Sequence, residues 1–231
     1  MVKKRNESLE EYIYEEIRSA ILKRKIPLDM HLSEEQLAEA FKVSRTPIRS
    51  VLKRLNYEKT IKIIPNKGAF INNPTSQEME DVFQLRALLE SDAVKYACRN
   101  ATQQQLDELE SLTYQEEKLY KEDHYDKAIQ ITSEFHHKIV CLMGNKLMEE
   151  YSKELINISN IYLAYHDHAD KESPLCPHEH REIIKAIRNG DEGEAVQVFL
   201  NHFKTVKKYL AVKGDKDHNI SLTEIFQPIK N

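Results

Sequence analysis

Three histidines share predicted helical faces with apolar residues, and their side chains could bind a metal ion. His136, His180 and His202 fall on three separate predicted helices, each at helical spacing from apolar neighbours. Neutral imidazole is the commonest protein ligand for zinc and similar metals. A single inward histidine is more often a hydrogen-bonded core residue, whereas three that converge on one core favour a metal site.

A second group of side chains with binding chemistry is basic. Residues 42–67 contain eight Lys or Arg and one acidic residue, Glu58. One predicted helix in this segment contains Arg45, Arg49, Lys53 and Arg54. A cationic helix of this kind is typical of DNA binding. The alternative is a solvated basic face on an ordinary helical hairpin.

The elements that present these basic residues are predicted to be two short helices joined by a turn, between Ser33 and Asn56. Ser33 and Gln36 have the spacing of an N-terminal capping box, and Ser44 can cap the second helix. Helical spacing predicts that the second helix buries Ile48, Val51, Leu52 and Leu55. This layout is that of a helix-turn-helix, whose second helix enters the major groove.

The flanking segments extend this motif to a winged helix. A helix is expected from Leu9 to about Arg24. Two short strands, Ile61–Ile64 and Ala69–Ile71, are separated by the turn-forming run Pro65–Gly68. Lys67 lies at the tip of the predicted wing, where it either contacts DNA or is a solvated turn residue.

The rest of the chain has the apolar spacing of an all-α bundle, and the polar run Asn72–Ser76 marks the expected boundary. Helices are predicted at residues 76–99, 102–121, 125–143, 146–165, 177–189 and 192–212. The fold is therefore expected to be mainly α, with a winged helix-turn-helix domain over residues 1–74, a bundle of about six helices over 75–213 and a C-terminal tail over 214–231. The runs Cys176–His178 and His166–His168 are predicted to lie in or near loops.

The first bundle helix is expected to begin with Ser76 as its cap. Its inward residues are predicted to be Val82, Leu85, Leu88 or Leu89, and Ala93. Arg86 lies one turn before Glu90, so these two side chains are expected to form an ion pair.

Composition and charge predict a soluble, helix-rich protein whose N-terminal part, residues 1–74, binds a polyanion. The chain has 231 residues, of which 40% are hydrophobic and 31% charged, and no apolar run has the length of about 20 residues that a membrane span needs. Residues 1–74 hold 15 Lys/Arg against 10 Asp/Glu, whereas residues 75–231 hold 19 against 28. Three cysteines without a CxxC pair fit a reducing compartment, so a cytoplasmic location is expected.

Residues Leu9–Asn73 resemble the winged-helix domain of the GntR family of bacterial transcription regulators. The matching residues are Ile17, Ile21, Leu32–Ala38, Val43–Arg49, Leu52, Leu55 and Gly68–Ile71. The resemblance implies that Arg45 and Arg49 are the main contacts to bases and phosphates. The full DNA-binding set is expected to be Ser44, Arg45, Thr46, Arg49, Lys53, Lys67 and Gly68. At position 35, where some members have an Arg that touches DNA, this chain has Glu35.

Residues 76–212 resemble the FCD ligand-binding domain of the FadR branch of that family. The matching pieces are Arg86–Glu90, Phe135–His136, Gly144–Asn145, His180–Ile184, Ala186–Ile187, Gly190–Asp191, Ala195 and His202. Many FCD domains hold a divalent metal through three histidines and an Asp one turn before the Phe-His pair. Here Thr132 occupies the Asp position, so the resemblance implies a divalent metal such as zinc on three imidazoles, with a metal-free pocket as the alternative. It also places Arg86 and Thr132 near the effector, for which a small carboxylic acid is expected.

These features predict a ligand-responsive transcription regulator that binds a palindromic operator as a homodimer, with repression as the commoner outcome in the family. The effector would shift the population between placements of the winged helices. One alternative is a metal-dependent helical-bundle hydrolase that uses the three histidines. It needs a general base that the inward faces do not offer, and it leaves the winged helix unexplained. Another is an architectural DNA-binding protein with an inert bundle.

Overall fold

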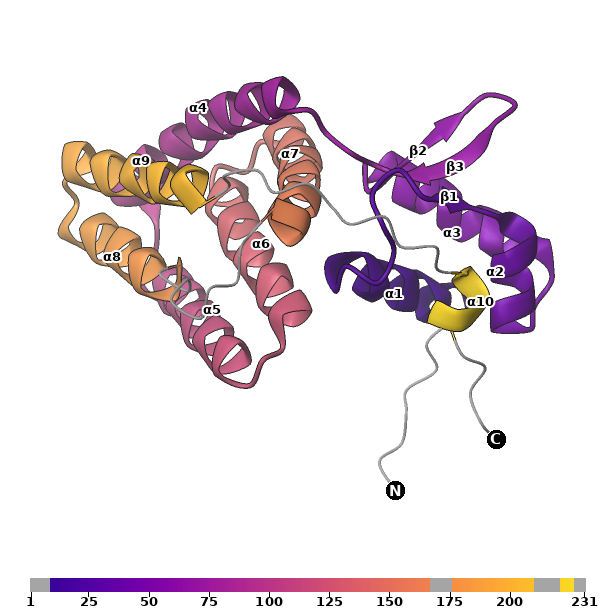
Figure 1. Ribbon diagram of the computed structural model, residues 1–231. Helices are drawn as coiled ribbons and strands as arrows, with labels where there is room; N and C mark the ends of the chain where they lie inside the picture. Colours follow the sequence, from indigo (N-terminus) through magenta and orange to yellow (C-terminus); the bar gives the residue numbers. More distant parts are fainter. Residues whose placement is uncertain (1–8, 167–175, 210–220, 227–231) are drawn as a thin grey trace. The chain divides into compact units, whose positions relative to one another are not determined.

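The computed structural model describes residues 9–166, 176–209 and 221–226 of the chain. Two compact units are present (Figure 1). The winged-helix unit comprises Met1–Asn73 together with Gly214–Asn231, and the helical bundle comprises Pro74–Lys213. The segment expected to be a separate C-terminal tail therefore contributes its described part to the winged-helix unit.

Helices and a small sheet form the winged-helix unit. Its elements are α1 (Leu9–Leu22), β1 (His31–Leu32), α2 (Glu34–Phe41), α3 (Arg45–Tyr57), β2 (Ile61–Ile64), β3 (Gly68–Ile71) and α10 (Leu222–Ile225). The three strands are antiparallel in the order β1-β3-β2. The predicted hairpin is confirmed, but the sequence analysis missed β1, which pairs His31 with Phe70 and Leu32 with Ala69.

The positions of α2 and α3 follow from their caps and their buried faces. The Ser33 hydroxyl accepts the Gln36 backbone N–H at 3.4 Å, as predicted. Lys42 then adopts a left-handed conformation with φ of 54°, which ends α2. The four residues predicted to be buried on α3 are all buried, and they are Ile48, Val51, Leu52 and Leu55. Burial of this stripe against α1 and α2 fixes which side of α3 remains outside.

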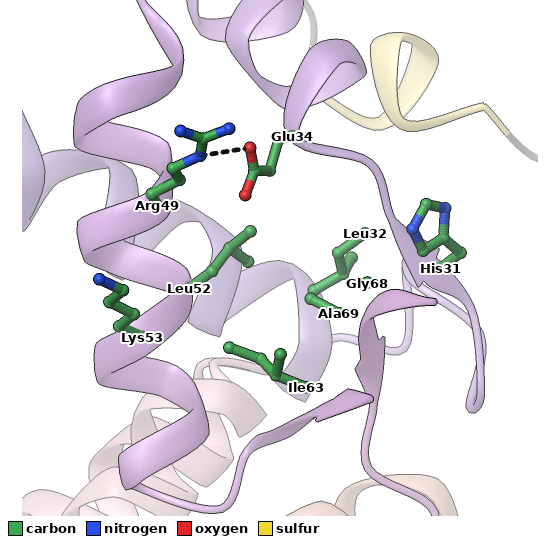
Figure 2. Close-up of a pocket in the computed structure, with 9 residues that line it drawn as sticks. All are labelled: His31, Leu32, Glu34, Arg49, Leu52, Lys53, Ile63, Gly68 and Ala69. Atoms are coloured by element: carbon green, nitrogen blue, oxygen red, sulfur yellow. Dashed lines mark hydrogen bonds and ion pairs between the residues drawn. The ribbon is translucent and has the colours of Figure 1, made fainter. Parts of the chain in front are cut away.

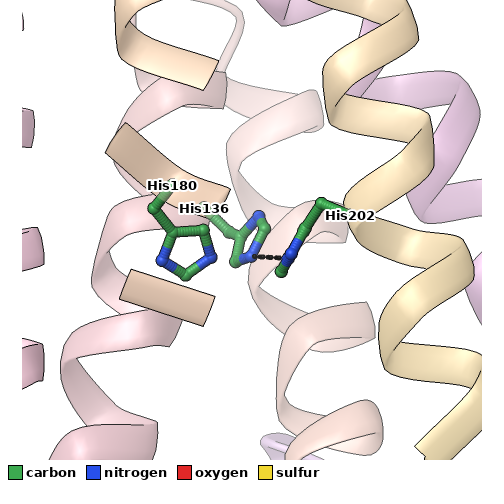
Figure 3. A group of neighbouring side chains, drawn as sticks. All are labelled: His136, His180 and His202. Atoms are coloured by element: carbon green, nitrogen blue, oxygen red, sulfur yellow. Dashed lines mark hydrogen bonds between the residues drawn. The ribbon is translucent and has the colours of Figure 1, made fainter. Parts of the chain in front are cut away.

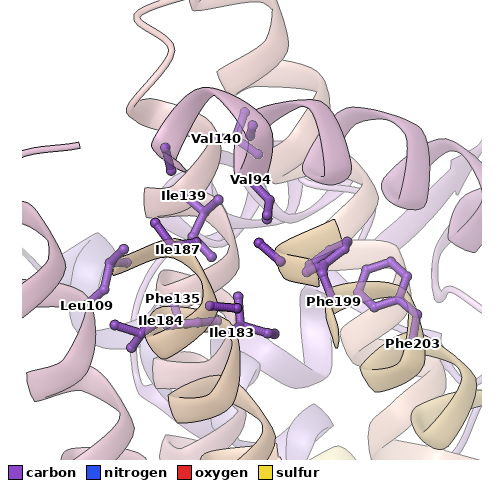
Figure 4. Packing of buried hydrophobic residues seen from close by; sticks show 14 of the residues in the cluster. Val94, Leu109, Phe135, Ile139, Val140, Ile183, Ile184, Ile187, Phe199 and Phe203 are labelled. Atoms are coloured by element: carbon purple, nitrogen blue, oxygen red, sulfur yellow. The ribbon is translucent and has the colours of Figure 1, made fainter. Parts of the chain in front are cut away.

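Six helices make up the described part of the bundle. They are α4 (Ser76–Asn100), α5 (Gln103–Lys121), α6 (Tyr125–Cys141), α7 (Lys146–His166), α8 (Cys176–Asn189) and α9 (Glu192–Tyr209). Their inward faces meet in one apolar core that includes Leu109, Phe135, Ile139, Ile183 and Phe199 (Figure 4). The mainly α fold expected from the sequence is thus confirmed.

The first bundle helix differs from the prediction in two respects. Thr75, rather than Ser76, is the N-cap of α4, and it forms a capping box with Glu78. Leu85 and either Leu88 or Leu89 were expected to face inward, but Leu85 and Leu88 are 50% and 65% exposed and Leu89 is half-buried. The inward face is instead rotated towards Arg86 and Glu90, so that a charged pair occupies part of the interior. Two large apolar side chains are left on the surface of the described molecule.

Candidate DNA-binding face and histidine cluster

The basic side chains of α3 lie on the outer side of the winged-helix unit, where the sequence places them. The side chains of Arg45 and Arg49 are 53% and 59% exposed. Arg45 pairs with Glu35 at 3.2 Å, and Arg49 pairs with Glu34 at 2.7 Å. Lys53 is also exposed. Because exposed ion pairs contribute little stability, both guanidinium groups can exchange their glutamate partners for DNA phosphates.

Other predicted DNA-contact residues flank this face. Ser44 and Thr46 are exposed at the start of α3. Ser44 occupies the N-cap position of α3, as predicted, although its side chain makes no capping hydrogen bond. Arg54 instead contacts α1, with Glu11 at 2.6 Å and the Tyr14 ring centroid at 3.5 Å. The outward part of the basic cluster that is free of α1 therefore comprises Arg45, Arg49 and Lys53.

The wing lies beside α3 and forms a pocket of about 570 Å³ with it (Figure 2). The pocket is lined by His31, Leu32, Glu34, Arg49, Leu52, Lys53, Ile63, Gly68 and Ala69. Lys67 is exposed in the turn that precedes β3. Gly68 has φ of +99°, and a β-carbon there would lie 2.5 Å from the His31 Nε2 atom. Gly68 is thus required by the wing turn, which presents Lys67 to solvent.

The structure brings His136, His180 and His202 together in the bundle core. They come from α6, α8 and α9, and none is more than 3% exposed. One ring nitrogen of each lies within 4.8 Å of those of the other two (Figure 3). His136 Nε2 and His202 Nε2 are 3.3 Å apart, and His180 Nε2 is buried without a hydrogen-bond partner among the described residues. This triad can hold a metal ion.

The Nδ1 atom of each histidine is bound by a glutamate. The three pairs are His136 with Glu90 at 2.8 Å, His180 with Glu116 at 2.8 Å and His202 with Glu179 at 2.7 Å. A carboxylate only accepts hydrogen bonds, so each Nδ1 donates and each Nε2 lone pair remains available. Histidine ligands of metals almost always use their second nitrogen in this way.

Burial keeps the imidazoles of His136 and His202 neutral. Removal from water lowers the pKa of His136 to about 3, against the opposing effect of Glu90, and burial also lowers the pKa of His202. Burial disfavours ionised Glu90, but Arg86 and His136 outweigh it and lower the pKa of this carboxyl to about 2. His136 and His202 both donate through Nδ1, so the Nε2 atom of each neutral ring carries a lone pair. These two Nε2 atoms lie 3.3 Å apart, which brings the two lone pairs close together. That contact is favourable only with a cation or a proton near both Nε2 atoms, so the residues present fit a metal.

Thr132, which occupies the position of the family's Asp, directs its hydroxyl to a glutamate. Its Oγ1 donates to Glu116, and it also lies 3.1 Å from the carbonyl oxygen of Ala128. Glu116 in turn binds His180. Thr132 therefore supports the carboxylate that orients His180, and this carboxylate comes from α5 rather than α6.

Arg86 makes the predicted ion pair with Glu90 and is almost completely buried. Its Nε donates to Glu90 at 2.6 Å, and its Nη1 donates to the Ser159 hydroxyl at 2.8 Å. The guanidinium carbon also lies 4.9 Å from the ring centroid of Phe203. Arg86 and Glu90 thus join the histidine cluster to α7 through a charged, hydrogen-bonded chain.

The three histidines could be predicted from the sequence, but their three carboxylate partners could not, and Glu90 was expected only as a partner of Arg86. Glu116 and Glu179 belong to charged runs that look like surface positions, and the statement that no Asp or Glu is well placed on the inward faces was wrong. The one signal in the sequence that could have pointed to Glu179 is its position immediately before His180.

The runs Cys176–His178 and His166–His168 were predicted to lie in or near loops. Cys176 and His178 belong instead to the first turn of α8, and residues 167 and 168 lie outside the described residues.

A winged helix with an outward basic helix, followed by a helical bundle with a buried histidine cluster, is the architecture of a DNA-binding regulator. Residues 9–71 match the family described as bacterial regulatory proteins of the gntR family, and residues 81–205 match the FCD domain. The protein belongs to the GntR family of transcription regulators and contains an FCD domain. The match is to regulators and not to a family of enzymes.

Relatives and solved structures agree with this assignment. The Nta operon transcriptional regulator of Aminobacter aminovorans is 31% identical over 174 residues, which cover 75% of this chain and 80% of that one. The HTH-type transcriptional repressor RspR of Escherichia coli (strain K12) is 23% identical over 80% of this chain and 81% of its own. The structure of E. coli McbR/YncC superposes with a TM-score of 0.73 at 19% identity, covering 88% of this chain and 97% of that one, and so shares the fold. Among the helices that the structure describes, none is both long and apolar enough to cross a membrane.

Proposed function

We propose that the protein is a ligand-responsive repressor that binds a palindromic operator as a homodimer, with a divalent metal and a small carboxylic acid bound in the helical bundle. The observation that supports the sensory part most strongly is the convergence of three buried imidazoles from α6, α8 and α9. The exposed arginines of α3 support the DNA-binding part. Repression is supported by the relative RspR, which is named as a repressor. The regulator would act in the cytoplasm, where the DNA is.

Arg49→Ala is expected to weaken operator binding by about 1–3 kcal/mol, because the side chain is placed to reach a base edge or a phosphate. The measurement is a fluorescence-anisotropy titration with operator DNA selected from a random-sequence pool, at fixed salt concentration.

Lys118→Ala is the matched control, because Lys118 is an exposed base on the acidic bundle. The Lys118→Ala protein should bind the selected DNA with wild-type affinity. If Arg49→Ala also binds the selected DNA with wild-type affinity, Arg49 is not a DNA contact.

A homodimer is supported by apolar side chains that the described part of the bundle leaves exposed. Leu85 and Leu88 on α4 and Leu147 and Tyr151 on α7 are 50–65% exposed, and α4 and α7 pack on each other. A subunit interface that covers these residues would remove their apolar surface from water. Palindromic operator sites then match the two-fold symmetry of the protein.

Leu88→Glu is expected to convert the dimer to a monomer, because a charge would be buried at the interface. Light scattering coupled to size-exclusion chromatography measures the mass directly. The control is Tyr57→Glu, which places the same charge on a 78% exposed side chain of the winged-helix unit. A Leu88→Glu protein that remains dimeric at micromolar concentration would place the interface elsewhere.

The residues that would hold the metal are His136, His180 and His202, each through Nε2. The side chains around them include three carboxylates, of Glu90, Glu116 and Glu179, and one guanidinium, of Arg86. Counted as formal charges, these groups have an excess of two negative charges. A divalent cation would balance that excess. An all-nitrogen ligand set favours zinc, nickel or cobalt over magnesium or calcium. A bound metal ion supplies an open coordination position for a carboxylate oxygen of the effector.

A carboxylic acid effector is supported by this open position and by Arg86, whose guanidinium is in the same buried network. A thermal-shift screen of small organic acids, with and without a chelator, tests the proposal. We expect one class of acids to raise the melting temperature, and the chelator to abolish the effect. Stabilisation that persists without metal would show that the acid binds the bundle in another way.

A further inference from the structure

A short C-terminal helix completes the surface of the helix-turn-helix. α10 packs on α2, and its Leu222 and Phe226 are 0% and 7% exposed. The Phe226 ring lies 5.0 Å from the ring of Phe41, which in turn contacts Tyr12 of α1 at 6.3 Å. Ser221 and Glu224 form a capping box that fixes the start of α10. The winged-helix unit is therefore built from two segments that lie far apart in the sequence.

This contact does not belong to either matched family segment. The two family models cover residues 9–71 and 81–205, so α10 and the chain that leads to it lie outside both. In the order of the described elements, α10 follows α9, the helix that contains His202. Two stretches of chain therefore join the bundle to the winged-helix unit: one enters α4 after Asn73, and the other leaves α9 after Tyr209.

We propose that the surface formed by Tyr12 and Phe41 is a docking site for an apolar C-terminal segment of this chain, and that α10 acts as a second tether between the bundle and the DNA-binding unit. The tether restricts the reorientation of the winged-helix unit and connects it to the helix of His202. This inference does not depend on the presence of a metal or an effector.

The connection between Tyr209 and Ser221 sets the physical properties of the tether. Twelve residue steps span at most about 40 Å when fully extended. Covalent connection also makes docking intramolecular, at an effective concentration in the millimolar range. Two apolar side chains are then enough to keep the site occupied, although the same segment would bind weakly as a separate peptide.

Amide hydrogen exchange of the full-length protein tests the docking. Phe226→Ala is expected to speed exchange of the amides at the C-terminal end of α2 at least tenfold, and Leu222→Ala provides a second variant with the same expected effect. Exchange in the bundle should not change. Glu224→Gln is the matched control, because this exposed residue keeps a cap acceptor and removes no apolar surface. Wild-type exchange rates in α2 of both alanine variants would overturn the docking.

A peptide added in trans separates docking from a general loss of stability. A synthetic peptide of residues 214–231, at millimolar concentration, should restore slow exchange in α2 of the Phe226→Ala protein. The same peptide with Phe226→Ala should not. Failure of the wild-type peptide to protect α2 would show that the surface is not a binding site for this segment.

The tether has its own readout. Backbone ¹⁵N relaxation gives the rotational correlation time of each unit, and we expect the winged-helix unit of Phe226→Ala to tumble faster than that of the wild type. The Glu224→Gln protein should behave like the wild type. Equal correlation times in the Phe226→Ala and wild-type proteins would refute the tether.

Discussion

His180→Ala is expected to remove stoichiometric zinc binding from the protein. The Nε2 atom of His180 is buried without a partner among the described residues and faces His136 and His202, so its loss leaves two ligands in place of three. Loss of a residue that only orients a metal ligand costs roughly 10–100-fold in affinity, and loss of the ligand itself should exceed that range. Elemental analysis of the purified protein and a competition titration with a chromophoric chelator measure the effect.

Two further variants make this experiment decisive. His178→Ala changes an exposed histidine two residues earlier on α8 and should retain zinc with wild-type affinity. Glu116→Gln keeps the ligand but removes the carboxylate that accepts from His180 Nδ1, so an intermediate loss of about 10–100-fold is expected. If His180→Ala holds one zinc as tightly as the wild type, the three histidines are not the metal site.

Arg86→Ala is expected to lower the free energy of unfolding by about 3–5 kcal/mol, because it leaves a buried carboxylate without its cation. Glu90 is 1% exposed, and its ion pair with Arg86 is the shortest of its contacts. The Ser159 hydroxyl loses its guanidinium donor at the same time. Urea denaturation followed by circular dichroism measures the loss.

Arg99→Ala is the control for this prediction, because the Arg99–Glu192 pair also joins two bundle helices but is exposed to solvent. Solvent screens exposed ion pairs, so the loss of this pair should change the free energy of unfolding little. A similar small loss in Arg86→Ala would mean that Glu90 finds another partner or takes up a proton. The comparison therefore measures the effect of burial on an ion pair of otherwise similar chemistry.

Local sequence signals were sufficient for most of the fold. The stripe of Ile48, Val51, Leu52 and Leu55 predicted both the position of α3 and its buried side, because helical periodicity reports burial directly. β1 was missed because two residues are too short for a periodic pattern, and its formation depends on pairing with β3.

The predicted inward face of α4 was wrong at Leu85 for a different reason, whereas Val82 and Ala93 are buried as predicted. Leu85 and either Leu88 or Leu89 were assigned to the interior from the helical spacing of apolar residues, but Arg86 and Glu90 take that side of the helix. Charged residues can be buried when a partner compensates them, and the partner here includes His136 on another helix. Such a tertiary compensation is not visible in the local sequence.

The same limit applies to the histidine site. The histidines themselves stand out in the sequence because imidazoles are unusual on apolar helix faces. Glu116 and Glu179 do not stand out, because they belong to charged segments and their partners lie on other helices. Thr132 was recognised as a departure from the family pattern, but its bond to Glu116 depends on the packing of α5 against α6.

The contact between α10 and α2 has a consequence for synthesis of the protein. Phe41 and Phe226 are 185 positions apart, and the whole bundle lies between them in the sequence. At a translation rate of about 5–20 residues per second, Phe41 waits roughly 10–40 seconds for its partner. The winged helix can fold early on the ribosome, but its apolar patch on α2 stays uncovered during that time. The DNA-binding unit is complete only when translation has passed Phe226. A truncated product that ends within the bundle therefore lacks part of the bundle and also lacks the α10 contact of its winged-helix unit.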